Sequence, residues 1–252
     1  MSDSKEYTQK RALFEKMLTI YGRNAVYEAL LDPNTQPFRL HLSTSNKPIE
    51  IIDRLKKIAI KRGAEILFHD KNELSRISKN AKQDQGVALD IKMQSFIDIT
   101  TFLQTHDSYR ILAVDGVENP QNLGLIIRSA CAGNIDAILL AKKGNTALGS
   151  LVIKASAGTL FKMPILRVDD LGMSLKMLQS QGAKVYTMSL QATKSYKEIE
   201  YDAKSIFVVG NESRGVSEPI EALSDHRIII PMQRGVESLN VAVAASLLAF
   251  LD

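Results

Sequence analysis

Near the end of the chain, Ser238 offers a hydroxyl just before an uncharged run over residues 239–251, and Asn240 offers an amide near the start of that run; a short β-branched run precedes both. The order of strand, polar loop and apolar run predicts a final helix, with Ser238 as its N-cap and Asn240 in its first turn. Free backbone amides at such a helix start can bind a small polar ligand. By itself, however, this spacing is more typical of an ordinary connection in an α/β core.

Two earlier segments carry further polar groups beside apolar runs. Asn122 is followed six residues later by Arg128, and Gly210 is followed two residues later by Glu212. Taken alone, Arg128 would be expected in a surface ion pair and Glu212 near a helix N-terminus.

The three segments together, and in this order, resemble the three signature motifs of the SpoU (TrmH-type) RNA ribose 2′-O-methyltransferases. The matching positions are Asn122, Gly124 and Arg128 in the first motif, Gly210, Glu212 and Gly215 in the second, and Ile230-Pro-Met with Ser238-Leu-Asn-Val in the third. The resemblance is close over about the last 140 residues. It is looser over the first 90, where residues 21–30 and 85–89 resemble the family's substrate-binding domain.

The resemblance implies a methyl donor and the residues that contact it. The cofactor would be S-adenosylmethionine, held largely by backbone in a trefoil knot. The cofactor-binding positions implied are Gly210, Ile230, Leu239, Met188 and Asn211. Gly210 would allow close approach of the backbone, and Ile230 and Leu239 would sandwich the adenine.

The resemblance also implies a catalytic set. Its members are Arg128, Asn122, Glu212, Ser238 and Asn240. Because an arginine resists deprotonation, we expect Arg128 to grip the target phosphate and stabilise the developing alkoxide rather than act as a base. Glu212 is expected to orient Arg128 or Asn122. In the first domain, Arg23 and Asn24 are expected to touch RNA.

Charge is unevenly distributed along the 252 residues. Residues 1–90 hold 16 Lys and Arg against 12 Asp and Glu, whereas residues 91–252 hold 16 of each, so the net charge of +4 lies in the first part. A basic domain beside a neutral one suggests an RNA-binding module attached to a catalytic module, although four charges are a weak excess. One cysteine permits no internal disulfide and fits the cytoplasm. Four scattered histidines predict no metal site, and no apolar run predicts a membrane span.

The hydrophobic pattern predicts an α/β protein with two domains. In the first, strands are expected over 38–42, 65–68 and 87–91, and helices over 22–31, 48–61 and 71–77. In the second, a parallel sheet is expected from strands 111–115, 137–140, 165–168, 184–189, 205–209 and 228–230, with helices over 120–131, 148–155, 171–178 and 239–251. The expected boundaries are an arm over 1–18 that becomes helical from Arg11, an RNA substrate-binding α/β domain over 19–91, a linker over 92–109 and a methyltransferase domain over 110–252.

The final helix is apolar on all sides, so one face should need a partner beyond its own sheet. Together with the resemblance, this predicts a homodimer; a helix buried entirely within one protomer is the alternative. The predicted activity is S-adenosylmethionine-dependent 2′-O-methylation of structured RNA, ribosomal RNA in the first place. A tRNA substrate and a non-catalytic RNA-binding or ribosome-assembly factor remain as alternatives. A dinucleotide-dependent oxidoreductase would need a glycine-rich phosphate loop, which this sequence lacks.

Overall fold

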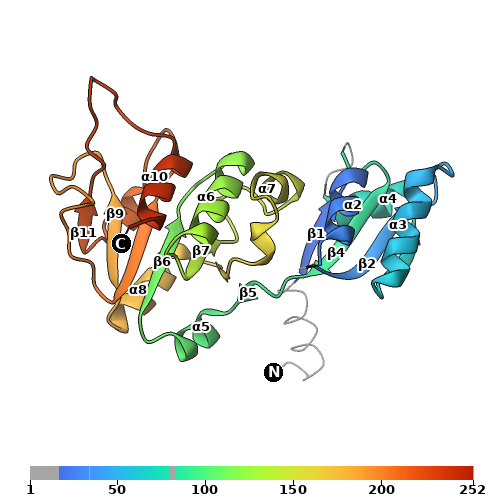
Figure 1. Cartoon of the computed structure of the whole chain (residues 1–252), viewed down its shortest axis with the longest axis horizontal. Helices are drawn as coiled ribbons and strands as arrows, with labels where there is room; N and C mark the ends of the chain where they lie inside the picture. Colours follow the sequence, from blue (N-terminus) through green and yellow to red (C-terminus); the bar gives the residue numbers. More distant parts are fainter. Residues whose placement is uncertain (1–16, 34, 80–82, 252) are drawn as a thin grey trace. The chain divides into compact units, whose positions relative to one another are not determined.

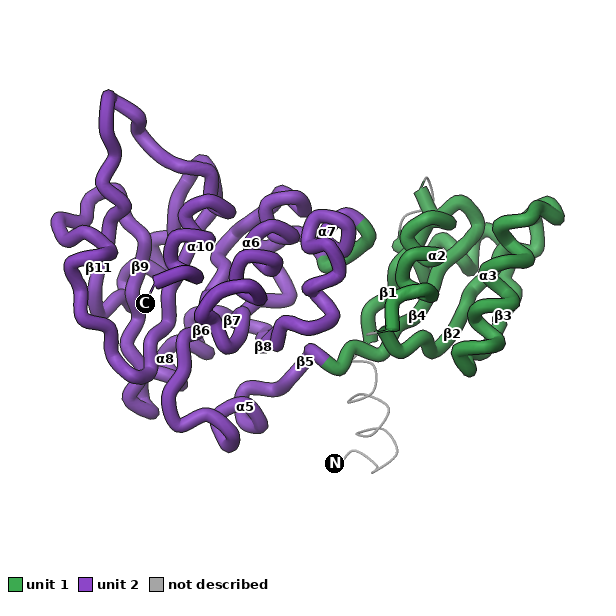
Figure 2. The backbone as a smooth tube through the Cα atoms, in the orientation of Figure 1, with its two compact units in different colours: residues 1–94, 148–150 green, residues 95–147, 151–252 purple. Residues whose placement is uncertain are grey.

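The computed structural model describes residues 17–33, 35–79 and 83–251. The chain forms two compact units, shown in Figure 2. Unit 1 comprises residues 1–94 and 148–150, and unit 2 comprises residues 95–147 and 151–252.

Unit 1 is a four-stranded sheet with three helices among its described residues (Figure 1). Its elements are β1 (Met17–Tyr21), α2 (Arg23–Leu31), β2 (Gln36–Ser43), α3 (Glu50–Lys61), β3 (Glu65–His69), α4 (Lys71–Ser78) and β4 (Val87–Lys92). The strand order is β1-β4-β2-β3, with β2 and β3 parallel and the other pairs antiparallel. Fully buried Ile20, Leu40 and Leu89 contribute to its core.

A row of polar side chains crosses this sheet, with one residue from each strand. Thr19 Oγ1 donates to Asp90 Oδ1 (2.6 Å), and Asp90 Oδ2 lies 2.9 Å from His41 Nε2. His41 Nδ1 in turn lies 2.9 Å from His69 Nε2. Asp90 and His41 are both buried, so the row provides the hydrogen bonds that buried polar groups need.

Unit 2 contains a seven-stranded, all-parallel sheet in the order β11-β9-β10-β6-β7-β8-β5. Its strands are β5 (Phe96–Ile97), β6 (Tyr109–Val114), β7 (Ala137–Ala141), β8 (Ile165–Val168), β9 (Lys184–Met188), β10 (Lys204–Val209) and β11 (His226–Ile228). Its helices are α5 (Ile99–Thr105), α6 (Pro120–Ala132), α7 (Ser150–Ala155), η1 (Thr159–Phe161), α8 (Leu171–Ser180), α9 (Glu218–Glu221) and α10 (Val241–Ala249). The predicted parallel α/β fold is therefore confirmed; the trefoil knot stays a prediction.

Both faces of the large sheet are buried. Ile111 and Ala113 of β6 belong to a cluster with residues of α5, α8 and α9, while the alternate residues Leu112 and Val114 are also fully buried. α6 and α10 pack against each other and contact β7 and β10 respectively. Along the chain, β6, β7 and β8 are added side by side toward one edge of the sheet. The next strand, β9, lies on the other side of β10, which itself neighbours β6. The direction in which strands are added therefore changes between β6 and β10. In parallel α/β sheets, ligands bind at the carboxyl ends of strands near such a reversal.

Three boundaries differ from those predicted. The expected linker over 92–109 contains β5 and α5, because Phe96 and Ile97 pair with β8 as an edge strand and Asp98 caps α5 through the Thr101 amide. The expected arm over 1–18 ends earlier, since Met17 and Leu18 already pair in β1. The predicted start of its helix at Arg11 lies outside the described residues.

The third difference concerns the final helix. Asn240, not Ser238, is the N-cap of α10, because its Oδ1 accepts a hydrogen bond from the Ala242 amide (2.9 Å). The helix is also not covered on all sides within one chain. Val243 is 47% exposed and Phe250, at its C-cap, is 58% exposed.

Candidate functional site

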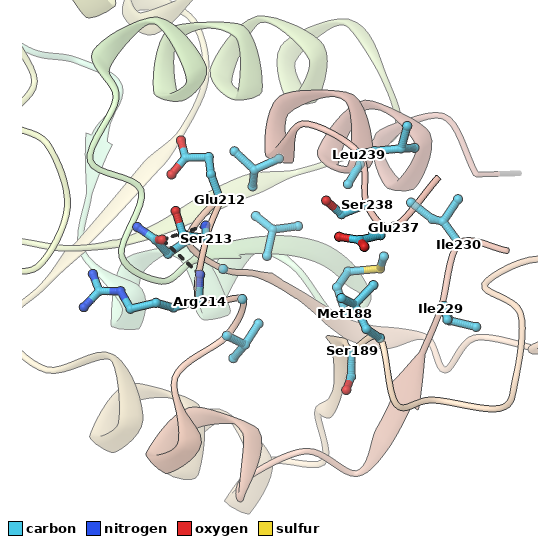
Figure 3. A pocket seen from close by; sticks show the side chains of 18 of the residues that line it. Met188, Ser189, Glu212, Ser213, Arg214, Ile229, Ile230, Glu237, Ser238 and Leu239 are labelled. Carbon is cyan, nitrogen blue, oxygen red and sulfur yellow. Dashed lines mark hydrogen bonds between the residues drawn. The ribbon is translucent and has the colours of Figure 1, made fainter. Parts of the chain in front are cut away.

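A cavity of about 450 Å³ lies in unit 2 at the carboxyl ends of β9, β10 and β11 (Figure 3). Its walls come from the segments that follow these three strands and from the start of α10. The lining residues are Met188, Ser189, Leu190, Gln191, Val209, Gly210, Asn211, Glu212, Ser213, Arg214, Gly215, Val216, Glu221, Ile229, Ile230, Met232, Glu237, Ser238, Leu239, Val241 and Ala244. Every predicted cofactor-binding residue is among them. Their role toward a cofactor stays a prediction.

Gly210 sits where the chain leaves β10 and turns back on itself. Asn211 and Gly215 exchange two backbone hydrogen bonds (2.8 and 2.9 Å), which close a tight loop over 211–215. A Cβ on Gly210 would lie only 2.1–2.2 Å from backbone atoms of Gly215 and Val216. Glycine at this position is therefore required by the loop itself, independently of any ligand.

The side chain of Asn211 serves this same loop. Its Nδ2 donates to the Gly116 carbonyl (2.8 Å), and its Oδ1 accepts from the amides of Ser213 (2.9 Å) and Arg214 (3.2 Å). Asn211 thus ties the end of β10 to the segment that follows β6. Asn211 therefore contributes to the cavity by fixing the loop over 211–215, because both the nitrogen and the oxygen of its side-chain amide already make hydrogen bonds.

A chain of side-chain hydrogen bonds joins the three motif segments. Asn122 Nδ2 donates to Glu212 Oε1 (2.5 Å), and Asn240 Nδ2 donates to Asn122 Oδ1 (3.1 Å). Asn122 is buried and projects from the first turn of α6, which begins with Pro120 at N1 as predicted. Of the two partners expected for Glu212, Asn122 is the one to which it is hydrogen-bonded within one chain, and the role of Glu212 stays a prediction.

The two sides of the cavity differ in character. Figure 3 shows the side chains of Glu212 and Arg214 on one side, and those of Glu237, Ser238 and Met188 on the other. Ile230 is buried and Leu239 is partly exposed beside them. The cavity therefore combines apolar surface with carboxylates at its edge, which suits a ligand that has an apolar ring and a positive charge.

Arg128 is placed apart from this chain of hydrogen bonds. It lies on the exposed face of α6, whereas Asn122 on the same helix is buried. Six residues correspond to about 600° of rotation, so the two side chains diverge by roughly 120° around the helix axis. Within one chain the described residues show no hydrogen bond or ion pair from Arg128 to Asn122 or Glu212.

Sequence reasoning missed three charged residues in the lining of the cavity, namely Arg214, Glu221 and Glu237. Arg214 Nη2 lies 2.8 Å from Glu118 Oε1, and both side chains are largely exposed. Glu237 also lines the cavity. Arg214 lies inside the second motif and Glu118 at the edge of the first, so the motif segments themselves could have directed attention to both residues.

The two predicted RNA-binding residues lie in unit 1. Arg23 is the first residue of α2 and lines a separate cavity, while Asn24 is exposed on the same turn. No group of three or more His, Cys, Asp or Glu side chains able to hold a metal ion occurs in the part of the chain that the structure describes. In the same part, every helix falls short of the length and apolar character needed to cross a bilayer.

Comparison with known proteins matches each of the two units to a family. Residues 109–250 match the SpoU rRNA Methylase family, and residues 19–97 match the RNA 2′-O ribose methyltransferase substrate-binding domain. Proteins assigned to the TrmH family of tRNA/rRNA methyltransferases are similar along nearly the whole chain. The one from Staphylococcus saprophyticus is 30% identical over 237 residues, covering 92% of this chain and 94% of the relative. The one from Staphylococcus aureus is 31% identical over 235 residues, covering 92% and 93%.

Solved structures share the fold. The SpoU methyltransferase AviRb from Streptomyces viridochromogenes, crystallised with AdoMet, superposes with a TM-score of 0.67 at 18% identity, covering 98% of this chain and 91% of that protein. An AdoMet-bound rRNA methyltransferase from Sinorhizobium meliloti superposes with a TM-score of 0.64 at 21% identity, covering 98% and 88%. The hydrogen bonds that join the three motif segments and the match over more than half of the chain lead to one conclusion: this protein belongs to the SpoU family of RNA methyltransferases.

Proposed function

We propose that this protein transfers a methyl group from S-adenosylmethionine to the 2′-hydroxyl of a ribose in structured RNA, with ribosomal RNA as the substrate. The observation that carries the proposal is the hydrogen-bonded chain from Glu212 through Asn122 to Asn240. It joins three distant segments beside a cavity of suitable size for a nucleoside-sized cofactor.

The residues of the cavity fit S-adenosylmethionine, which supplies an electrophilic methyl group on a sulfonium. Gly210 leaves backbone without a side chain beside the cavity, and Ile230 and Leu239 offer apolar surface for an adenine. The carboxylates of Glu212 and Glu237 would complement the positive charge of the sulfonium. The two AdoMet-bound relatives of the same fold support this assignment.

The side chains of the motifs would position the ribose. Glu212 holds the Asn122 amide in one orientation, and Asn240 fixes its carbonyl oxygen from the other side. We assign Ser238, exposed in the loop before α10, to a contact with cofactor or nucleotide. Arg128 would grip the target phosphate and stabilise the alkoxide, because its guanidinium stays protonated throughout.

The proposed active form is a homodimer. Leu125 on α6 and Val243 and Phe250 on and beside α10 are 42%, 47% and 58% exposed, and these two helices pack side by side. Apolar side chains gathered on adjoining helices favour a second copy of the chain as their cover. Analytical ultracentrifugation should show a dimer that dissociates when Phe250 is replaced by Glu; a wild-type monomer at micromolar concentration would contradict this assignment.

Ribosomal RNA is favoured over tRNA by the two-unit layout. The rRNA methyltransferase from Sinorhizobium meliloti aligns with 98% of this chain, whereas the TrmH/SpoU tRNA-modifying enzyme from A. aeolicus aligns with 57%. The single cysteine is in keeping with action in the reducing cytoplasm. A tRNA substrate is the second candidate, since the curated relatives are described as tRNA/rRNA enzymes.

Methyl transfer from labelled S-adenosylmethionine to RNA from cells lacking this protein tests the proposal. The label should appear in ribosomal RNA, at one position that resists alkaline cleavage, because a 2′-O-methyl group removes the attacking hydroxyl. If the label appears only in tRNA, the substrate is tRNA and not ribosomal RNA. If the label appears in a base, the assignment of the 2′-hydroxyl as the methyl acceptor is wrong. An absence of both transfer and calorimetric cofactor binding would favour a non-catalytic RNA-binding protein.

A further inference from the structure

An exposed ion pair beside the cavity of unit 2 has no part in the proposed function. Arg214 Nη2 lies 2.8 Å from Glu118 Oε1, and the two side chains are 72% and 68% exposed. Glu118 follows β6 and Arg214 follows β10, so the ion pair joins the same two parts of the chain as the hydrogen bond between Asn122 and Glu212. An ion pair this exposed contributes little to stability, and its partners can be exchanged at low cost.

We propose that Arg214 binds a phosphodiester beside the target ribose, and that Glu118 occupies Arg214 until RNA replaces it. This inference rests on the proposed function. A ribose of RNA cannot approach Asn122 without the phosphates on its two sides, and the carboxylates of Glu118 and Glu212 would repel them. A cation is therefore needed at this place. Among the described residues that line the cavity, only Arg214 is cationic.

The backbone of Arg214 is fixed, whereas its side chain is held at one point. Two backbone hydrogen bonds between Asn211 and Gly215 close the loop over 211–215, and Asn211 Oδ1 accepts from the Arg214 amide (3.2 Å). Of the guanidinium nitrogens, only Nη2 has a partner in the part of the chain that the structure describes, and that partner is Glu118. The guanidinium therefore keeps donors for a phosphate, which it can bind through two parallel hydrogen bonds.

The Arg214 side chain is directed away from the surface assigned to the adenine. Figure 3 shows it extending away from Ile230 and Leu239 on the other side of the cavity. Its partner Glu118 is not among the residues that line the cavity. The α-carboxylate of S-adenosylmethionine is the other anion that Arg214 could bind. The direction of the side chain, toward Glu118 and solvent, favours an RNA phosphate over the cofactor.

Glu118 does not cap the helix that follows it. The N-cap of α6 is Asn119, whose Oδ1 accepts from the Gln121 amide (2.8 Å). Within the described residues, the Glu118 carboxylate has its hydrogen bond from Arg214 and from no other side chain. Glu118 thus takes the place of a phosphate in the free protein. It lowers the affinity for RNA, because each RNA that binds must first displace it.

Two substitutions with opposite expected effects test the proposal. The probe is fragmented ribosomal RNA from cells lacking this protein, without S-adenosylmethionine. Arg214→Met should weaken RNA binding by the full-length protein roughly fivefold and lower the slope of log K against log salt by about 1, because one phosphate contact is lost. Glu118→Gln removes the competing carboxylate and should strengthen binding roughly threefold at low salt, with a smaller gain at high salt.

Lys184→Met is the matched control. It removes the cation of another exposed ion pair of unit 2, between Lys184 Nζ and Asp225 Oδ1 (3.2 Å). Lys184 is the first residue of β9, whereas the cavity lies at the carboxyl end of that strand. This substitution should change neither the RNA affinity nor the salt slope.

A purely structural ion pair predicts a different pattern. If the pair only fastened the loop over 211–215, Arg214→Met and Glu118→Gln would both weaken RNA binding or both leave it unchanged, and either result would overturn the proposal. Weaker binding of S-adenosylhomocysteine but not of 5′-methylthioadenosine in Arg214→Met, with RNA affinity unchanged, would also overturn it, because Arg214 would then bind the cofactor carboxylate. If Arg214→Met does not fold, Glu118→Gln decides the question, since RNA binding that is not strengthened contradicts the proposal.

Failure of the proposed function gives a separate result. In that case the two substitutions would still move RNA affinity in opposite directions, but the wild-type protein would transfer no methyl group to a ribose. In an active enzyme, Arg214→Met should raise KM for RNA more than it lowers kcat, and Glu118→Gln should lower KM. Methyl transfer to a ribose with KM unchanged in both variants would reject the role of Arg214 and leave the proposed function intact.

Discussion

The amide nitrogen of Asn122 lies 2.5 Å from a carboxylate oxygen of Glu212, although 90 residues separate the two in the chain. The polarity of this hydrogen bond is fixed, since the amide nitrogen can only donate and the ionised carboxylate can only accept. Asn240 donates to the opposite end of the Asn122 amide, which excludes the flipped orientation. Glu212 therefore determines which way a buried amide of the first motif faces.

Reversing the donor and the acceptor tests this relationship. Asn122→Asp would set two carboxylates against each other and should reduce methyl transfer by at least about tenfold at pH 8. Glu212→Gln keeps an acceptor and should have a smaller effect. The double variant places a Gln donor opposite an Asp acceptor, so it should regain activity relative to Asn122→Asp alone. Additive losses in steady-state kinetics would contradict the pairing. Glu200→Gln, an exposed carboxylate outside the cavity, serves as the control.

Gly210→Ala should displace the loop over residues 211–215, because its Cβ would overlap the backbone of Gly215 and Val216. The expected result is a lower melting temperature and at least a tenfold loss of cofactor affinity by calorimetry. Gly144→Ala is a matched control, since Gly144 has a positive φ of 87° but no atom within 4 Å of the added Cβ. Gly144→Ala should lower the free energy of unfolding by only about 1 kcal/mol, from the backbone strain of a side chain at positive φ, and it should bind the cofactor as the wild type does. Equal effects of the two changes would argue against a specific role for Gly210.

Arg128 faces outward from the same helix as Asn122, beside the exposed Leu125. In a homodimer formed through α6 and α10, it would serve the site of the partner subunit. Arg128→Ala and Asn122→Ala should each be inactive as pure dimers while still binding cofactor. Mixing the two under conditions that allow subunit exchange should restore about a quarter of the wild-type turnover, because half of the dimers then contain one intact site. Complete inactivity of the mixture would place Arg128 in the site of its own chain.

Acid should destabilise unit 1 through Asp90. Burial by itself raises the pKa of this carboxyl, but the hydrogen bonds from His41 and Thr19 and the charges of His41 and Arg39 outweigh burial and lower it. A carboxyl with a lowered folded-state pKa stabilises the fold above its unfolded pKa of about 4, and this stabilisation is lost as the pH falls through the folded-state pKa. The protection factors of the β4 amides, corrected for the intrinsic exchange rate at each pH, should therefore fall below about pH 4.

Asp90→Asn should reduce protection of the β4 amides at neutral pH and remove most of this pH dependence. Asp225→Asn provides the comparison in unit 2. The pKa of Asp225 is also lowered, because hydrogen bonds from the Val185 amide, Gln179 and Lys184 outweigh burial. This variant should change the acid sensitivity of β9 and leave β4 as in the wild type. The same pH profile for β4 in Asp90→Asn and in the wild type would exclude Asp90 as the cause.

Much of the strand and helix order could be predicted because local signals and tertiary structure agree. Continuous apolar runs mark the buried parallel strands, and Pro120 marks the start of α6 at N1. β5 was missed because two residues carry no periodicity; Phe96 and Ile97 become a strand only by pairing with β8. The start of α10 was misplaced by two residues because Ser238 and Asn240 are both good N-caps, and only the fold selects between them.

The candidate site was less accessible to sequence reasoning. The motif resemblance brought Asn122, Glu212 and Asn240 together, but the choice of Asn122 over Arg128 as the partner of Glu212 depends on helix rotation and burial. The row from Thr19 to His69 also left no signal, since each strand contributes a single polar residue and the partners lie in different segments. Such contacts are long-range, and spacing along the chain does not encode them.

The end of α10 is hydrogen-bonded to β6 and to the segment after α6, which lie more than 100 residues earlier in the chain. Arg110 Nη1 donates to the Leu251 carbonyl (2.6 Å) across 141 residues, and the Asn134 amide donates to the Ala249 carbonyl (2.6 Å). Contacts of such high sequence separation form slowly, because a long loop must close before they contribute. During synthesis, α6 and β6 emerge well before the segment that covers them. Until that segment is translated, the apolar surface that it covers is exposed to solvent. The nascent unit 2 should therefore depend on chaperones, and slow expression at low temperature should increase the yield of folded protein.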